Sequence, residues 1–164
     1  KISLQLHFAG VMAGAEMAEG RPVWVPSTPL PPTGAGFGGA LFPEEVAKTQ
    51  AAEIKSVSFK VMEQEDIDQV VEWFAAGAER AKRAGFDAVE IHGGHGYIIS
   101  GFCSRATNRR TDGYGGSIEN RGRLLREVTT AVRERVGPDY PMWVKMDSTE
   151  FFTEDGVTID EASA

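Results

Sequence analysis

The feature of this sequence that most constrains its fold is an alternation of short strands with amphipathic helices. Residues 2–6, 87–91 and 142–146 each form a short run of the kind found in strands. Apolar residues recur every three or four positions over 65–84 and over 124–136, which predicts a helix before the second strand and another before the third. This order favours a parallel sheet with right-handed crossovers, in either an open doubly wound sheet or a closed barrel.

Residues at the ends of both helices support these boundaries. Glu65 and Asp66 suit the positive N-terminal end of the first helix, and Gly85 can turn the chain out of its last turn. Ser117 can cap the start of the second helix, and Gly137-Pro138 can stop it.

The lengths of the connections favour the barrel. Each helix is followed by its strand within a few residues, whereas about 25 residues separate Ile91 from the second helix, against a usual loop of roughly 2 to 6. Barrel active sites are built from such loops at the C-terminal ends of the strands. We therefore expect an α/β fold that is part of a TIM (β/α)8 barrel, because only three strands are recognisable and 164 residues fall short of the roughly 250 that a full barrel takes.

A proline-rich and glycine-rich stretch interrupts the pattern early in the chain. Six of the eight prolines lie between Pro22 and Pro43, together with several glycines. Helix and central strand are disfavoured there, so the stretch is predicted to be a long loop. A loop of this length either covers a site or is disordered, and composition does not decide between the two.

Charge and cysteine content exclude several classes of function. The net charge of −7 disfavours nucleic-acid binding, because the protein would repel the phosphate backbone. No apolar run approaches the roughly 20 residues of a membrane-spanning helix. The single Cys103 forms no internal disulfide and fits a reducing compartment, so a cytoplasmic location is expected. No sequence feature predicts an oligomeric state.

The segment from His92 to Tyr97 is the strongest candidate for chemistry, because it follows the second predicted strand directly. It places His92, His95 and Tyr97 within six residues, separated by glycines that let the backbone approach a flat ligand. Neutral imidazoles can stabilise an oxygen that becomes negative, and a phenol can donate a proton. A zinc site would need a third ligand, and none is obvious, so no metal is predicted. The plain alternative is a glycine-rich turn that happens to contain histidine.

Two further sets of polar residues have competing interpretations. The arginines of segment 104–117 could present cations to a phosphate, but such a loop more often binds to itself, and we favour the second reading. Gln5 and Lys145 lie within predicted strands that face the interior or its open end, where an unpartnered polar group is costly. They could contact a ligand, point outward or pair with other strand residues.

Several stretches together resemble the old yellow enzyme family of NADH:flavin oxidoreductases. They are Gln5-Leu6, AGFDAVEIHGGHGY (84–97) and NRRTDGYGGSIENR (108–121), with weaker similarity at Val25-Pro26-Ser27. The resemblance implies a TIM barrel that binds FMN across its mouth, takes hydride from NADH or NADPH and passes it to the β-carbon of an activated alkene. The three strands would be roughly strands 3 to 5, and residues 1–164 the central part of a single FMN-binding barrel domain, truncated at both ends.

The resemblance also implies roles for individual residues. His92 and His95 would hydrogen-bond the carbonyl or nitro oxygen of the substrate, and Tyr97 would protonate its α-carbon. Gln5 would contact the pyrimidine edge of the flavin. Lys145, where many members carry arginine, would lie near flavin N1 and the C2 carbonyl, where a cation stabilises the reduced ring.

The sequence departs from the family pattern in two respects. His7–Val11 stands where many members have a His-Ala-Gly-Arg ending. The second departure is that the chain, truncated at both ends, lacks the last strands of the barrel. Barrels usually hold a phosphate by the loops after strands 7 and 8, so we expect this chain alone to bind FMN poorly and to be inactive. Larger relatives carry an iron-sulfur cluster, whose four cysteines would lie outside this chain.

Two other classes of function compete with the flavoenzyme. One is a non-redox barrel lyase or isomerase, with His92 or His95 as acid or base and Lys145 as an electrophile. The other is a non-catalytic fragment or interaction module, whose long loop between Gly10 and Phe59 binds a partner.

Overall fold

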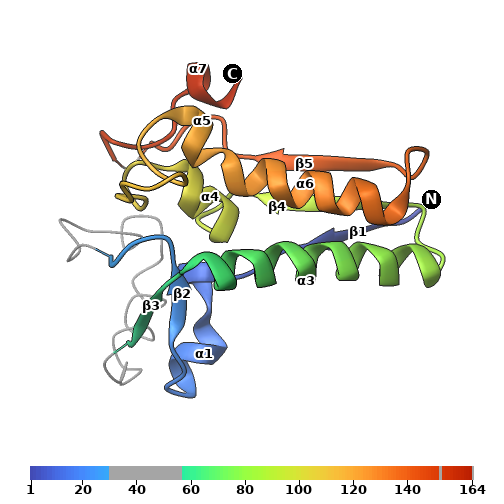
Figure 1. Cartoon of the computed structure of the whole chain (residues 1–164), viewed down its shortest axis with the longest axis horizontal. Helices are drawn as coiled ribbons and strands as arrows, with labels where there is room; N and C mark the ends of the chain where they lie inside the picture. The colour runs from blue at the N-terminus through green and yellow to red at the C-terminus, as the bar shows by residue number, and fades with distance from the viewer. Residues whose placement is uncertain (30–56, 152, 164) are drawn as a thin grey trace, which may run out of the picture.

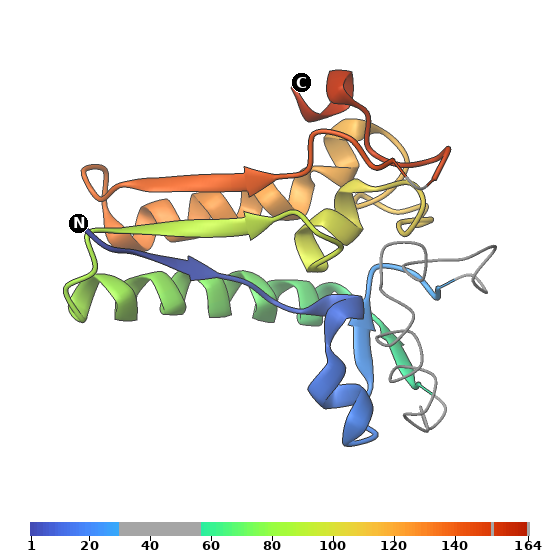
Figure 2. The same cartoon turned by 180° about the vertical axis from the view of Figure 1, so that it is seen from behind.

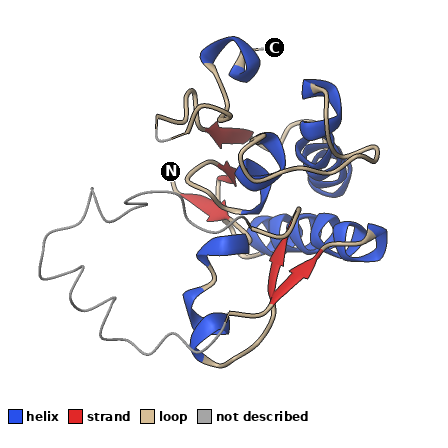
Figure 3. Cartoon of the chain, turned by 90° about the vertical axis from the view of Figure 1, so that its left-hand side faces the viewer, coloured by secondary structure: helices blue, strands red, loops and turns tan. Residues whose placement is uncertain are grey.

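The computed structural model describes residues 1–29, 57–151 and 153–163, and it is an α/β structure with a parallel sheet. Strands β1 (Ser3–Leu6), β4 (Ala88–Gly93) and β5 (Met142–Met146) form the sheet in the order β1-β4-β5. The long helices α3 (Gln64–Arg83) and α6 (Arg123–Val136) lie side by side against one face (Figures 1 and 2). Seen end-on in Figure 3, the described residues leave the opposite face of the sheet without a covering layer.

The strands and the first helix follow the sequence prediction closely. The third strand has the predicted bounds, the first begins one residue later and α3 is displaced by one residue at each end. Strand β4 continues to Gly93 instead of ending at Ile91, so His92 belongs to the strand. This extension matters because it fixes the direction of the His92 side chain.

The sheet register separates an apolar face from a polar one. Leu4 pairs with Val89, and Ile91 pairs with Val144; these residues contribute to the core under the helices. The apolar stripes of α3 and α6 complete that core with fully buried side chains such as Val70 and Val132. Each such side chain stabilises the fold by about 1.5–3 kcal/mol on burial.

A second, two-stranded parallel sheet corrects one prediction. Strands β2 (Val23–Val25) and β3 (Phe59–Val61) pair beside η1 (Gly10–Met12) and α1 (Gly14–Ala18). The expectation of a long loop from Pro22 to Pro43 is therefore wrong at its start, although β2 is not a central strand. Pro22 and Pro26 flank β2 without interrupting it, so their missing N–H groups do not break the ladder. Residues 30–56 of that predicted loop lie outside the described residues.

Three short helices gather near the C-terminal ends of the sheet strands, at the left of Figure 1: α4 (Ile98–Cys103), α5 (Ile118–Arg121) and α7 (Ile159–Ala162). Ser117, expected to cap the helix over 124–136, instead caps the separate short helix α5, by accepting a hydrogen bond from the Asn120 amide at 3.3 Å. Helix α4 was not predicted, because all of its residues are buried and it has no polar stripe. In the described part of the chain, no helix is long and apolar enough to cross a membrane.

Candidate active site

The predicted segment from His92 to Tyr97 lies at the C-terminal end of β4. His92 is buried inside the strand, with 4% of its surface exposed. The chain then turns through His95 and Gly96, both in left-handed backbone conformations, with φ of 60° and 74°. Tyr97 takes the N-cap position of α4. The turn therefore folds the three side chains back toward each other.

The rings of all three residues converge. The centroids of His92 and His95 lie 5.1 Å apart, and those of His92 and Tyr97 lie 4.7 Å apart. Two imidazoles and a phenol thus lie close together at a strand end. Such an arrangement can direct hydrogen-bond donors and a proton donor at the same ligand.

The surroundings of His92 favour the neutral form of its imidazole. Burial lowers the pKa of His92, and the nearby His95, Lys145 and His7 lower it further. Its Nδ1 atom is buried and has no hydrogen-bond partner in the described part of the chain. A buried polar atom left in this state costs about 1–3 kcal/mol, so His92 is suited to a contact that the protein itself does not supply.

His7 is a site residue that the sequence analysis did not single out as functional. Its ring centroid lies 5.0 Å from that of Tyr97 and 6.4 Å from that of His92, edge-on to both. His7 directly follows β1, and the pairing of Leu6 with Ile91 places it level with His92. The predicted parallel order of the strands could have indicated His7, because residues that follow neighbouring parallel strands emerge at the same edge of the sheet.

Gln5 and Lys145 lie on the polar face of the sheet, but at different levels. Lys145 is exposed and pairs in register with His92. Gln5 pairs in register with Glu90, one level further from the strand ends, and its Nε2 donates a hydrogen bond to Glu90 Oε1. Trp143 Nε1 donates to the other oxygen of Glu90 at 2.7 Å. These two hydrogen bonds lower the pKa of Glu90. Pairing with another strand residue, one of the open interpretations, is therefore what Gln5 does.

The arginine-containing loop binds mainly to the protein itself, as favoured from the sequence. Arg110 forms an ion pair with Asp112 at 2.6 Å and donates to the carbonyl oxygens of Pro26 and Met62. The buried Asn108 amide nitrogen donates to the carbonyl oxygens of Phe102 and Tyr114, at 2.6 and 2.7 Å. These contacts fix the loop beside α4.

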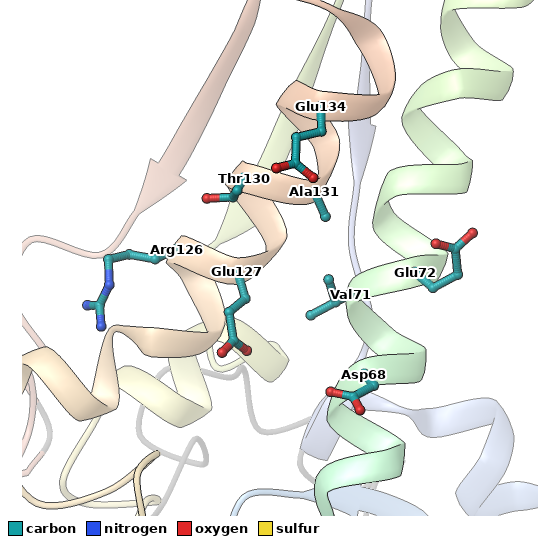
Figure 4. A pocket seen from close by; sticks show the side chains of 8 residues that line it. All are labelled: Asp68, Val71, Glu72, Arg126, Glu127, Thr130, Ala131 and Glu134. Atoms are coloured by element: carbon teal, nitrogen blue, oxygen red, sulfur yellow. The ribbon is translucent and has the colours of Figure 1, made fainter.

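Other features of the surface carry less chemistry. Within the described ranges, no group of three or more His, Cys, Asp or Glu could hold a metal ion. A shallow hollow between α3 and α6 (Figure 4) contains Asp68, Glu72, Glu127 and Glu134, with Arg126 at one side. It lies between the two helices, and none of the predicted site residues lines it.

Fold and site together define a class of protein. It is an α/β protein with a parallel sheet, and its polar residues gather at the C-terminal ends of the strands, where such folds bind ligands. The chain belongs to the NADH:flavin oxidoreductase / NADH oxidase family, whose profile matches residues 1–164.

Individual relatives agree with this assignment. The chain is 37% identical over 161 residues to an NADH oxidase from Thermoanaerobacter brockii, an alignment that covers 98% of this chain and 21% of that protein. It is 50% identical over 90 residues to an NADPH dehydrogenase from Halalkalibacterium halodurans, covering 55% of this chain and 26% of the relative. The matched segments thus span about a quarter of these curated relatives.

Solved structures give the same result. Old Yellow Enzyme from Pichia sp. AKU4542 superimposes with a TM-score of 0.72 at 35% identity, over 96% of this chain and 38% of that one. Morphinone reductase in complex with tetrahydroNAD superimposes with a TM-score of 0.71 at 34% identity, over 98% and 42%. The predicted resemblance to the old yellow enzyme family is confirmed.

Proposed function

We propose that this chain contributes part of the active site of an FMN-dependent oxidoreductase of the ene-reductase type. In this proposal the full-length protein uses NADH or NADPH to reduce the activated C=C bond of an α,β-unsaturated carbonyl or related compound. The observation that carries the proposal is the convergence of His92, His95 and Tyr97 at the end of β4, where His92 Nδ1 lacks a partner among the described residues. The family match and the names of the relatives support it.

The residues present fit a bound FMN. The polar face of the sheet is open in the described structure, and the unpaired His92 Nδ1 lies at the same level as the exposed Lys145. Gln5 and Lys145 are the residues that would hold the ring system. Gln5 would do so through its amide, whose nitrogen also donates to Glu90, and Lys145 through its positive charge. When bound, FMN supplies hydride transfer from the nicotinamide to the alkene.

The protein's own groups have complementary tasks in this proposal. His92, which is neutral, and His95 hold the substrate oxygen and stabilise the negative charge that develops on it. Each donor of this kind contributes about 2.7–4 kcal/mol of transition-state stabilisation in enzymes where it has been removed. Tyr97 gives its phenolic proton to the α-carbon, which completes the reduction of the double bond.

The domain assignment belongs to the same proposal. Residues 1–164 form the central part of a single FMN-binding TIM barrel, with β1, β4 and β5 as roughly its third to fifth strands. The parallel order β1-β4-β5 and the helix after each of the first two strands support it. A small activated alkene is the proposed substrate, and a cytoplasmic location remains a prediction.

The full-length protein tests the proposal directly. We expect the purified protein to show the absorption spectrum of bound FMN. NADH or NADPH should bleach this spectrum under anaerobic conditions, and an α,β-unsaturated ketone such as 2-cyclohexenone should restore it. A protein that carries no flavin and takes up no added FMN would contradict the proposal.

A further inference from the structure

We propose that Asp147 is a positioning residue that holds His95 and Tyr97 in their reactive arrangement. Asp147 directly follows β5, two residues after Lys145, and comes from a different strand than the groups it would position. The inference rests on the proposed function, because it concerns the residues to which catalysis is assigned.

The Asp147 carboxylate accepts hydrogen bonds from the turn that carries the catalytic side chains. The His95 backbone N–H points at both carboxylate oxygens, with distances of 3.0 Å to Oδ1 and 2.8 Å to Oδ2. The Ser100 hydroxyl donates to Oδ2 at 2.9 Å, and the Gly96 N–H lies 3.3 Å from the Ser100 oxygen. One carboxylate therefore fixes the middle of the turn directly and its next residue through Ser100.

These bonds hold a backbone conformation that histidine rarely adopts. The φ of 60° at His95 lies in the left-handed region, which is unfavourable for residues with a Cβ atom. Hydrogen bonds to an ionised acceptor are stronger than bonds between neutral groups, so Asp147 can stabilise this conformation.

The packing at Gly94 shows that the turn is built closely around Asp147. A Cβ atom at Gly94 would lie 2.8 Å from Asp147 Oδ1 and 3.3 Å from the Asp147 backbone nitrogen. The backbone at Gly94 can come this close to the carboxylate only because glycine has no side chain. The contact leaves the turn little freedom to shift relative to the end of β5.

Asp147 is a positioning residue because its carboxylate is already engaged by the protein. His92 depends less on it, since His92 lies within β4, where it pairs with Lys145 of β5. His95 and Tyr97 lie beyond the strand, and the contacts that orient them include the Tyr97 N–H to Gly94 carbonyl bond at 3.3 Å. Misplacement by about 1 Å can slow a reaction about 10²-fold, so loss of the carboxylate should affect the step that uses Tyr97.

The test compares Asp147→Ala, Asp147→Asn and Asp139→Ala in the full-length holoprotein. Asp139 is an exposed residue just before β5, at the opposite end of the strand, and serves as the control. In Asp147→Ala we expect amide hydrogen exchange of residues 94–97 to accelerate about tenfold or more, because the acceptor of the His95 N–H is gone. Flavin oxidation by the alkene should slow about 10²-fold, whereas flavin reduction by NAD(P)H should stay within about twofold. Asp147→Asn keeps an oxygen acceptor and should recover most of both effects.

The outcomes separate this inference from the proposed function. The positioning role would be overturned if Asp147→Ala showed the same exchange rates and half-reaction rates as Asp139→Ala. It would also be overturned if both half-reactions slowed equally. If wild-type protein neither binds FMN nor reduces alkenes, the proposed function fails, and the exchange data still decide whether Asp147 holds the turn.

If Asp147→Ala does not fold, Ser100→Ala replaces it. That variant should accelerate exchange at Gly96 and slow alkene reduction about threefold to tenfold, and an unchanged result would overturn the inference.

Discussion

The lowered pKa of His92 makes the stability of the protein dependent on pH. Burial lowers the pKa of His92 in the folded protein, so the unfolded chain, with an ordinary histidine pKa of about 6.5, takes up a proton first as the pH falls. Titration of His92 therefore leaves the free energy of unfolding unchanged above about pH 6.5. Below that pH the free energy of unfolding declines until the folded-state pKa of His92 is reached. We expect the free energy of unfolding of the full-length protein to decrease between pH 7 and pH 5.5.

The variant His92→Asn checks this expectation, because it removes the titrating group. Its unfolding free energy, measured by urea denaturation, should change less over the same pH range than that of wild type. The carboxylates with lowered pKa values, such as Asp66 and Asp112, lose their stabilising effect only below about pH 4, outside this window. Identical pH slopes for the two proteins would show that His92 is not held neutral by folding.

Tyr97→Phe tests the proton donor. We expect flavin reduction by NAD(P)H to persist in the full-length variant, while reduction of poorly activated alkenes falls about 10²-fold or more, in the range of general acid catalysis. Stopped-flow absorbance of the flavin measures the two half-reactions separately. Equal loss in both would argue against proton donation by Tyr97.

Tyr140→Phe provides a matched control for that experiment. The Tyr140 hydroxyl donates to the Phe86 carbonyl oxygen at 2.8 Å. Tyr140 precedes the start of β5, whereas Tyr97 follows the end of β4, so the two tyrosines lie at opposite ends of the sheet. Its removal deletes one hydroxyl and one hydrogen bond, with an expected loss of stability of about 1 kcal/mol. Both half-reactions should keep their wild-type rates.

Among individual functional residues, the sequence could predict those that share one segment. His92, His95 and Tyr97 lie within six positions after one strand, and the structure brings their rings together. His7 and Asp147 come from the ends of the two neighbouring strands. Their role depends on the pairing of β1 and β5 with β4, which periodicity along a single strand does not contain.

Among the elements, those with a regular apolar pattern were predictable and the irregular ones were not. Helix α3 and strand β5 follow their periodicity to within a residue. The predicted second helix is divided at Gly122, because Ser117 caps a separate short helix before α6 begins. Buried α4 and the short β2 lack an amphipathic signal, and tertiary packing determines them.

Arg121 shows how the short elements are held together. Only 2% of Arg121 is exposed, and it donates to the carbonyl oxygens of Cys103 and Gly116 and forms an ion pair with Glu161 at 2.6 Å. It thereby connects α4, the loop before α5, and α7. Arg121→Met removes the donor of the Cys103 and Gly116 carbonyl oxygens, whereas Glu161 keeps its ion pair with Arg105. We therefore expect a loss of about 1–3 kcal/mol in urea denaturation of the full-length protein.

Arg135→Met is the control for this prediction. Arg135 pairs with Glu72 and Glu79 on the surface of α3 and α6, where water competes with the ion pairs. Its replacement should change the midpoint of denaturation far less than that of Arg121. Equal effects of the two substitutions would mean that Arg121 does not connect these elements.

For the molecule as a whole, the open sheet makes the strongest case for a barrel. Within the described residues, β1 and β5 each pair only with β4, so alternate peptide groups along their outer edges have no strand partner. The face that carries Gln5, Glu90 and Trp143 is polar yet internally hydrogen-bonded, and 45% of Trp143 is exposed. The proposed closure into a TIM barrel would remove both edges and turn this face toward the barrel interior.

Hydrogen exchange of the full-length protein tests this closure, with β4 as an internal standard. Strand β4 is paired on both sides, so its amides report the protection of a fully enclosed strand. In a closed barrel we expect peptides covering β1 and β5 to exchange as slowly as those covering β4, because every strand then has two neighbours. In an open sheet, the amides on the free edges of β1 and β5 would exchange much faster than those of β4. That second pattern would mean that the polar face forms the outside of a sheet, and the lining of a barrel by Gln5 and Lys145 would have to be abandoned.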